Sequence, residues 1–412
     1  MNAPRSVHKA AMAPTTAALT LALLLSLQPA TTDVYLPALP ALTRDLQASI
    51  GSAQLTMSAL MLAFGFGQLF WGPVADRIGR RPSLLASLGA FALASVAAAL
   101  AGSIEWLVAW RVAQGFTLAG AVVCARAMVR DLYEPQEGAQ VMALALSWLG
   151  LVAICGPALG GVVASWWGWR AALGVVAAFG TITLIHIAWR LPETLAHANP
   201  HATDLRPMLA TWSRIARHPT FRAWTLLTAS TYGALFTHLA GSSFIYIDVF
   251  GVTPTTYGLW MAGGAASYLA GALTCRRWIP RFGARGTVGR AAFFTLAAGV
   301  GIALLAWHRQ AAPELMMAAT CLHMFSHGFH TPCGQTGTVA AFPRHAGAAA
   351  ALGGFVLALV AFGIGRWLAF ALDGTAWPFA WTVAGFSFLT SILAWTLVQR
   401  HGLVPAPAPA PG

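Results

Sequence analysis

The sequence predicts an all-α membrane protein of twelve transmembrane helices arranged as two six-helix bundles. Three observations predict this fold class. Of the 412 residues, 58% are hydrophobic and only 9% are charged, against roughly 25% charged in an ordinary soluble domain. Long uncharged runs recur along the whole chain. Counted with one further apolar span that contains a charge, they are divided into two sets of six by a basic, proline-containing stretch near the middle.

Each helix is predicted from a run without charged residues, because a spanning helix needs about 20 apolar residues and a charge inside the bilayer is costly. The twelfth span, roughly 104–128, is the exception, since it contains Arg111 and has Arg126 at its inner end. Residues 10–32 follow Lys9 as in a secretory signal, but no convincing cleavage site follows, so we expect a retained helix. The uncharged runs cover 10–32, 46–75, 82–104, 138–169, 171–189, 223–247, 249–275, 291–308, 315–343, 345–365 and 374–399.

The domain boundaries follow from these runs. We expect an N-terminal six-helix bundle over 1–190, a cytoplasmic linker over 191–222, a C-terminal six-helix bundle over 223–399 and a disordered Pro/Ala tail over 400–412. In the linker, apolar residues and arginines alternate at helix-like spacing in "RPMLATWSRIARHPTFR". This spacing predicts a short helix on the inner leaflet surface, and a solvated linker is the alternative.

The basic residues predict the orientation. With both termini in the cytoplasm, 19 of the 24 Lys and Arg residues lie on inner loops and tails, as the positive-inside rule requires. Arg111 lies within the membrane, and Arg44, Arg170, Arg309 and Arg366 lie near the outer side. The formal charge of +12 is dispersed among loops, so it does not predict a nucleic-acid partner.

Two halves of equal size are what a transporter needs if one bundle moves against the other to expose a central site to each side in turn. Lys9 is the only lysine, so the chain lacks the Gly-Lys pair of an ATP-binding P-loop. We expect a monomer in a lipid bilayer that uses an ion gradient, with a small molecule and protons as partners and with no cofactor or metal. An enzyme or a sensor would need a catalytic constellation or a large signalling domain, and neither is visible.

Two charged residues inside predicted spans are the candidates for proton coupling. Asp33, in "PATTDVYLPALP", is the only acid well inside a span, although it could instead cap or pack near the outer interface. Arg111 lies at a matching depth, about 10 Å below the outer helix end at 1.5 Å per residue. A change in their separation would load or release a proton, and a static salt bridge is the alternative.

The stretch "GPVADRIGRRP" at 72–82 places four charges in a short loop. It resembles the loop 2–3 signature of the major facilitator superfamily, which implies the major facilitator fold and a latch at the inner face. In that family the acid bonds to the facing half near the start of helix 11, and the basic residues bind nearby acids. A turn that only fixes topology is the alternative. The residues that match the signature are Gly72, Asp76, Arg77, Gly79, Arg80 and Arg81.

Two further motifs resemble that superfamily. "RVAQG" at 111–115 is similar to the helix 4 motif implicated in proton transfer, and "GPALGG" at 156–161 is similar to the helix 5 motif of antiporters. The glycines of the second motif allow close helix approach, and the proline bends the helix. The antiporter-motif residues are Gly156, Pro157, Gly160 and Gly161.

Nearly the whole chain resembles the bicyclomycin/chloramphenicol-resistance (Bcr/CflA) drug:proton antiporters. This resemblance implies export of small organic drugs from the cytoplasm across a bacterial inner membrane in exchange for protons. Export of an endogenous metabolite, or import of a solute by proton symport, is the alternative. The stretches that carry the resemblance are 31–40, 125–133, 191–195 and 341–352.

A site for varied drugs is expected to be apolar with a few polar groups. For each candidate, ordinary packing or contact with lipid is the alternative. His323, His327 and His330 share one face of helix 10, where they could bind a metal, act on protons in the cavity, or pack as neutral hydrogen-bonded side chains. The candidate cavity residues are Tyr35, Met57, Phe64, Gln114, Tyr232, Phe236, Phe244, Tyr246 and His327.

Overall fold

The computed structural model describes residues 12–307 and 312–403, and over this range it contains helices and no strand. The predicted all-α class is therefore confirmed. Arg309 and most of the predicted Pro/Ala tail lie outside the described residues.

The first half of the chain forms six helices, the last of which contains two spans. Helix α6 bends at Gly168, whose φ of 80° is a conformation that favours glycine. A 3-10 turn over Leu36–Ala38 separates α1 from α2. The helices are α1 (Pro14–Asp33), α2 (Leu39–Asp45), α3 (Ile50–Ile78), α4 (Arg80–Ala99), α5 (Ile104–Leu132) and α6 (Pro135–Arg190).

The second half repeats this plan after a linker. Helix α7 (Leu205–Arg217) forms where the linker spacing predicts a short helix, and α9 bends at Gly283, with a φ of 65°. A π-helical turn over Phe244–Val249 extends α8, and a 3-10 turn over Pro343–His345 precedes α11. The helices are α8 (Pro219–Ser243), α9 (Pro254–Trp307), α10 (Pro313–Ala340), α11 (Ala346–Ala371), α12 (Trp377–Trp395) and α13 (Leu397–His401).

Twelve spans can be counted in the described residues. Eight helical segments are long and apolar enough to cross a membrane, and two of them contain the bends of α6 and α9 and so supply two spans each. Helices α8 and α10 complete the twelve. They are not among the eight because they are rich in Thr, Ser, His and Gly.

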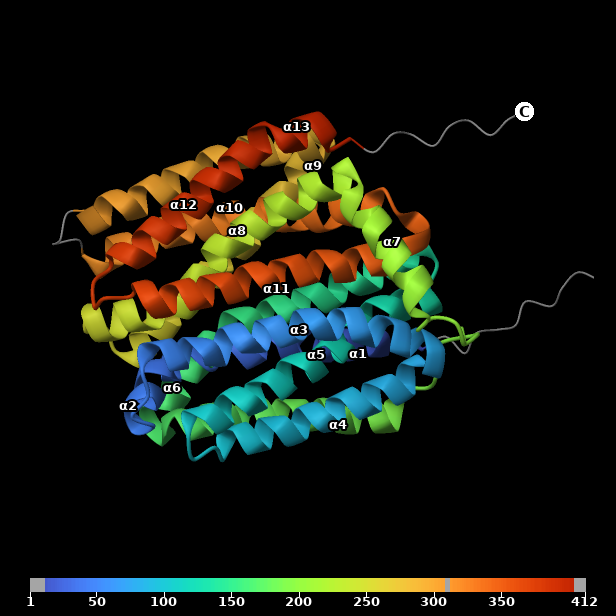
Figure 1. Cartoon of the computed structure of the whole chain (residues 1–412), viewed down its shortest axis with the longest axis horizontal. Coiled ribbons are helices and arrows are strands. Elements are labelled where there is room, and N and C mark those ends of the chain that lie inside the picture. The colour runs from blue at the N-terminus through green and yellow to red at the C-terminus, as the bar shows by residue number, and fades with distance from the viewer. Residues whose placement is uncertain (1–11, 308–311, 404–412) are drawn as a thin grey trace, which may run out of the picture.

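The spans form two bundles that pack along α3 and α11, and α7 crosses one end of the molecule between the bundles (Figure 1). Small residues permit the close packing of α3 and α11: a Cβ on Gly365 would meet the Ser58 side chain, and one on Gly354 would meet Gln68. We call the end that carries the 72–82 loop the Asp76 end and the opposite end the Asp45 end.

Contacts between the bundles close the Asp45 end. Arg44 Nη1 lies 2.8 Å from Asp248 Oδ1 of the other bundle. The Ser165 and Thr255 hydroxyls are 3.1 Å apart, and Gln54 Nε2 donates to the carbonyl oxygen of Ala240 at 2.6 Å. These contacts join the two bundles at this end.

Candidate functional site

Asp33 is the last residue of α1, and its carboxylate lies where α1 crosses α6. The Thr32 hydroxyl donates to Asp33 Oδ1 at 2.7 Å, and no ion pair reaches Asp33 from the residues that the structure describes. Its side chain remains partly exposed. Among the described residues Asp33 therefore lacks a permanent counter-ion, which is one property that a proton site needs.

The predicted antiporter motif packs directly against Asp33. A Cβ on Gly156 would lie 3.7 Å from Asp33 Cβ, and one on Gly160 would collide with the carbonyl oxygen of Val34. Only glycine permits α6 to approach α1 this closely. Asp33 and Gly156, which sequence spacing placed in separate motifs, thus lie next to each other.

The same stretch of α6 also contacts the second bundle. A Cβ on Gly161 would lie 2.6 Å from the carbonyl oxygen of Pro254, and one on Gly258 would collide with that of Pro157. The acid, the antiporter motif and the start of α9 therefore meet at one place between the bundles.

Arg111 is fully buried, with none of its surface exposed, and its guanidinium binds groups of the first bundle. It donates to the Thr31 carbonyl oxygen from Nη1 and Nη2 at 3.2 and 3.3 Å, and to the Thr56 carbonyl oxygen from Nε at 3.3 Å. It also lies over the Tyr35 ring, 4.4 Å from the centroid, and donates to Gln114 Oε1 at 3.2 Å.

The hypothesis of a charge pair between Asp33 and Arg111 is not met in this conformation, because no ion pair joins them in the described residues. Their depths match, but the guanidinium binds the Thr31 carbonyl on the same turn of α1 as Asp33. Arg111 therefore fixes the backbone that carries the acid and leaves the carboxylate unpaired.

The nine predicted cavity residues are placed in separate environments. Tyr35, Met57 and Gln114 surround Arg111. The Tyr232 hydroxyl reaches across the bundles to Met61 Sδ at 3.6 Å, and the Tyr232 ring packs on Phe236. Phe64 is partly buried, and Phe244, Tyr246 and His327 are buried in the second bundle.

The loop between α3 and α4 is held by ion pairs within the first bundle. Gly79, with a φ of 105°, forms the turn, a conformation that favours glycine. Arg80 is buried and binds Asp76 Oδ1 at 2.6 Å and Asp131 Oδ2 at 2.9 Å. Arg77 donates to the Thr203 hydroxyl, at 2.6 Å, and Arg81 donates to the Ala188 carbonyl oxygen.

Glu193 is a further residue of this loop's environment that sequence reasoning did not single out. Its carboxylate accepts from the backbone N–H groups of Arg80 and Arg81 at 2.9 and 3.1 Å, the first groups of α4 that lack a helical partner. Asp76, for which the resemblance implies a bond near the start of helix 11, binds Arg80 of its own bundle in this conformation. Glu193 stands in the "LPETL" stretch, and only that resemblance could have pointed to it.

Replacing Glu193 with glutamine is expected to lower the free energy of unfolding by about 1 kcal/mol, because the charged cap of α4 is lost. Thermal unfolding of the purified protein in detergent measures the change. Glu134→Gln is the matched control, since Glu134 is exposed and its side chain caps no helix. Equal unfolding temperatures for the two variants would contradict the capping role.

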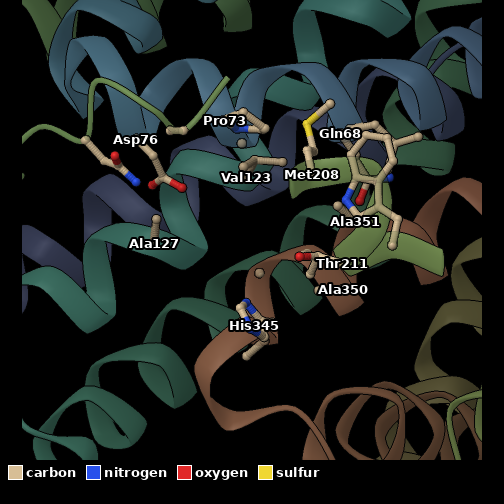
Figure 2. Close-up of a pocket in the computed structure, with 18 of the residues that line it drawn as sticks. Gln68, Pro73, Asp76, Val123, Ala127, Met208, Thr211, His345, Ala350 and Ala351 are labelled. Carbon is tan, nitrogen blue, oxygen red and sulfur yellow. The ribbon is translucent and has the colours of Figure 1, made fainter. Parts of the chain in front are cut away.

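A cavity of about 490 Å³ lies at the Asp76 end between the two bundles and the linker. Figure 2 shows Pro73 and Asp76 of α3 and Ala127 of α5 on one side of it, with His345 before α11 on another. Of the predicted site residues, Gly72, Asp76 and Arg80 line this cavity, and none of the nine cavity candidates does. The cavity therefore lies at the Asp76 end, opposite to the Asp45 end, where contacts join the two bundles.

The three histidines of α10 bond to hydroxyl groups of other residues in the second bundle. His327 Nδ1 lies 2.9 Å from Thr231 Oγ1, and His330 Nε2 lies 2.9 Å from Thr295 Oγ1. No group of three metal-ligating side chains occurs among the described residues. These contacts favour the alternative of hydrogen-bonded packing.

The two bundles, the unpaired intramembrane acid between them and the cavity open to one end define a multi-pass membrane transporter. The chain belongs to the Major Facilitator Superfamily, whose family model matches residues 21–253. This membership supports the prediction of a transporter rather than an enzyme.

Three relatives carry drug-resistance names. The chain is 32% identical over 256 residues to the chloramphenicol resistance protein of Pseudomonas aeruginosa, covering 61% of this chain and 59% of that protein. It is 26% identical over 266 residues to a bicyclomycin resistance protein homolog of Haemophilus influenzae, covering 65% and 67%. It is 27% identical over 337 residues to multidrug resistance protein D of Escherichia coli, covering 82% and 84%. The chain thus spans about two thirds or less of the length of the first two.

The fold is shared with solved transporters. The structure of the human organic anion transporter MFSD10 matches with a TM-score of 0.71 at 20% identity, covering 94% of this chain and all of that one. At that identity the likeness shows the fold alone.

Proposed function

We propose that the protein exports small organic drugs from the cytoplasm of a bacterium in exchange for protons, as a monomer in the inner membrane. The observation that carries this proposal is the unpaired Asp33 carboxylate, packed against the antiporter motif where the two bundles meet. The resistance names of the relatives support drugs as the substrate class. The Asp76 end, where most of the basic residues lie, faces the cytoplasm.

In the proposed mechanism, Asp33 binds a proton and the drug at different stages of the transport cycle. A neutral acid can enter the apolar interface between the bundles, whereas a charged one favours water. Proton binding at Asp33 therefore changes which packing of α1, α6 and α9 is stable. Arg111 holds the Thr31 carbonyl and keeps the acid in position through this change.

Proton flux in vesicles tests the proposal. The purified protein is reconstituted with an interior pH dye and a preset pH gradient, and a panel that includes chloramphenicol and bicyclomycin is added. At least one drug is expected to dissipate the gradient faster than in protein-free vesicles. A gradient that no drug affects, with inserted protein verified, would refute drug export. A solute that moves in the same direction as the proton would indicate symport instead.

Replacing Gly161 with valine is expected to separate the bundles at the Asp45 end, because the added side chain collides with the Pro254 carbonyl. The expected result is faster labelling of a cysteine placed at Ser165, which lies in the closed interface beside Thr255. Gly174→Val on the same helix is the matched control, since a Cβ there meets nothing within 4 Å. Equal labelling rates in the two variants would show that this contact does not hold the end closed.

A further inference from the structure

Two arginines of α5 line the cavity at the Asp76 end; they lie in the 125–133 stretch, to which no role has been assigned above. Arg126 and Arg130 are four residues apart and share a helix face with Val123 and Ala127, which also line it. Both guanidiniums are exposed, and neither has an ion pair or a hydrogen bond among the described residues. Two unpaired positive charges therefore face one enclosed space.

The other charges that line the cavity are already paired. Asp76 binds Arg80, and Asp204 Oδ2 lies 3.1 Å from His201 Nδ1. His345, which completes the ionisable lining, carries no negative charge. Neither carboxylate of the described lining forms an ion pair with the two α5 arginines.

A buried amide also faces this space without a partner. Gln68 is 3% exposed, lines the cavity and makes no hydrogen bond in the described part of the chain. Figure 2 shows it beside Met208 and Ala351. The Gln68 amide is therefore available to hydrogen-bond a polar group of a molecule bound in the cavity.

The opposite wall adds further positive potential. Helix α11 begins at Ala346, and its preceding residue, His345, gives no side-chain cap to the free N–H groups. A Cβ on Gly347 would lie 3.5 Å from Arg130 Nη2, so the guanidinium lies close to the start of that helix. The Arg130 guanidinium of one bundle and the positive N-terminus of α11 in the other therefore lie close together, with no acidic side chain described between them.

The rest of the lining is apolar. Val123, Ala127, Met208, Trp212 and Val339 surround the polar groups. The volume of about 490 Å³ falls in the range of roughly 300–1,000 Å³ that is usual for drug-sized ligands. The cavity thus combines an anion-binding end with an apolar body.

We propose that this cavity binds an amphipathic organic anion, with its carboxylate, sulfonate or phosphate group held by Arg126 and Arg130 and its apolar part against Met208 and Trp212. As a statement about the transported substrate this rests on the proposed function, but binding can be measured without transport. The same chemistry could be supplied by a soluble compound or by an anionic lipid headgroup.

Binding of a matched pair of probes in detergent tests the proposal. Naphthalene-2-sulfonate carries the anion, and naphthalene-2-sulfonamide is its uncharged counterpart of nearly the same shape. Calorimetry is expected to show that the sulfonate binds the wild type more tightly and that Arg126→Gln with Arg130→Gln weakens its binding about tenfold or more, because two charge-assisted contacts are lost. Binding of the sulfonamide is expected to be unchanged.

Arg214→Gln is the control, since Arg214 lies on α7 outside the cavity lining. Each single arginine variant is measured as well, so that a double variant that does not fold leaves the test intact. Equal sulfonate affinity in the wild type and in both folded single variants would overturn the proposal. Because binding is measured apart from flux, this outcome is distinguishable from a failure to export drugs.

A second arm distinguishes the two sources of the anion. Thermal unfolding is measured in nanodiscs of phosphatidylcholine with and without phosphatidylglycerol. Stabilisation by phosphatidylglycerol in the wild type but not in the arginine variants would identify a lipid headgroup as the occupant. Stabilisation by the sulfonate alone would identify a soluble anion, and stabilisation by neither would overturn the proposal.

Discussion

Replacing Asp33 with asparagine is expected to abolish drug-driven proton movement in vesicles while the protein still folds and inserts. The amide keeps the shape of the acid and can accept from the Thr32 hydroxyl, but it binds no proton. Because Asp33 has no ion pair to lose in the described structure, the thermal stability is expected to change little.

Asp373→Asn is the control for this experiment. Asp373 is exposed in the loop after α11, and its carboxylate accepts only from Thr375 of the same loop. This variant is expected to move protons at the wild-type rate. Proton exchange by Asp33→Asn at the wild-type rate would remove Asp33 from the mechanism.

Replacing Arg111 with methionine is expected to destabilise the first bundle by about 2 kcal/mol or more, because the buried Thr31 and Thr56 carbonyl oxygens and Gln114 Oε1 each lose a charged donor. Since the end of α1 that carries Asp33 is then no longer held by the guanidinium, drug transport is expected to fall as well. Arg111→Lys keeps the charge but not the planar donor geometry, and an intermediate effect is expected.

The control for Arg111 is Arg366→Met, because Arg366 is exposed and makes no ion pair or hydrogen bond among the described residues. Thermal unfolding in detergent measures the stabilities, and the vesicle assay measures transport. An unfolding temperature of Arg111→Met equal to that of Arg366→Met would show that the buried contacts do not stabilise the bundle.

The fold could be predicted because charge is excluded from the bilayer core, so that gaps between charged residues mark the spans. The boundary placed at Arg170 falls two residues from the bend at Gly168, although α6 is otherwise continuous. The polar helices α8 and α10 were also predicted, since their hydroxyl and imidazole groups are uncharged. Hydropathy alone does not select these two.

The candidate site was predicted only in part. Sequence spacing gave the depths of Asp33 and Arg111 but not the direction in which each side chain points, and the guanidinium turned out to bind a carbonyl. The cap that Glu193 supplies to Arg80 joins residues 113 positions apart, and no local pattern encodes such a contact. The cavity depends on how the two bundles are placed, which composition does not specify.

The most direct test of the account is the measurement of distances between the bundles at both ends. Spin labels are placed at Glu105 and Leu315 near the Asp45 end and at Glu137 and Arg276 near the Asp76 end, after the native cysteines are replaced. Acidic and alkaline buffers are then compared. The account predicts that one distance shortens as the other lengthens, and that Asp33→Asn loses this response to pH. Distances that do not change with pH at either end, or that change equally in Asp33→Asn, would contradict it.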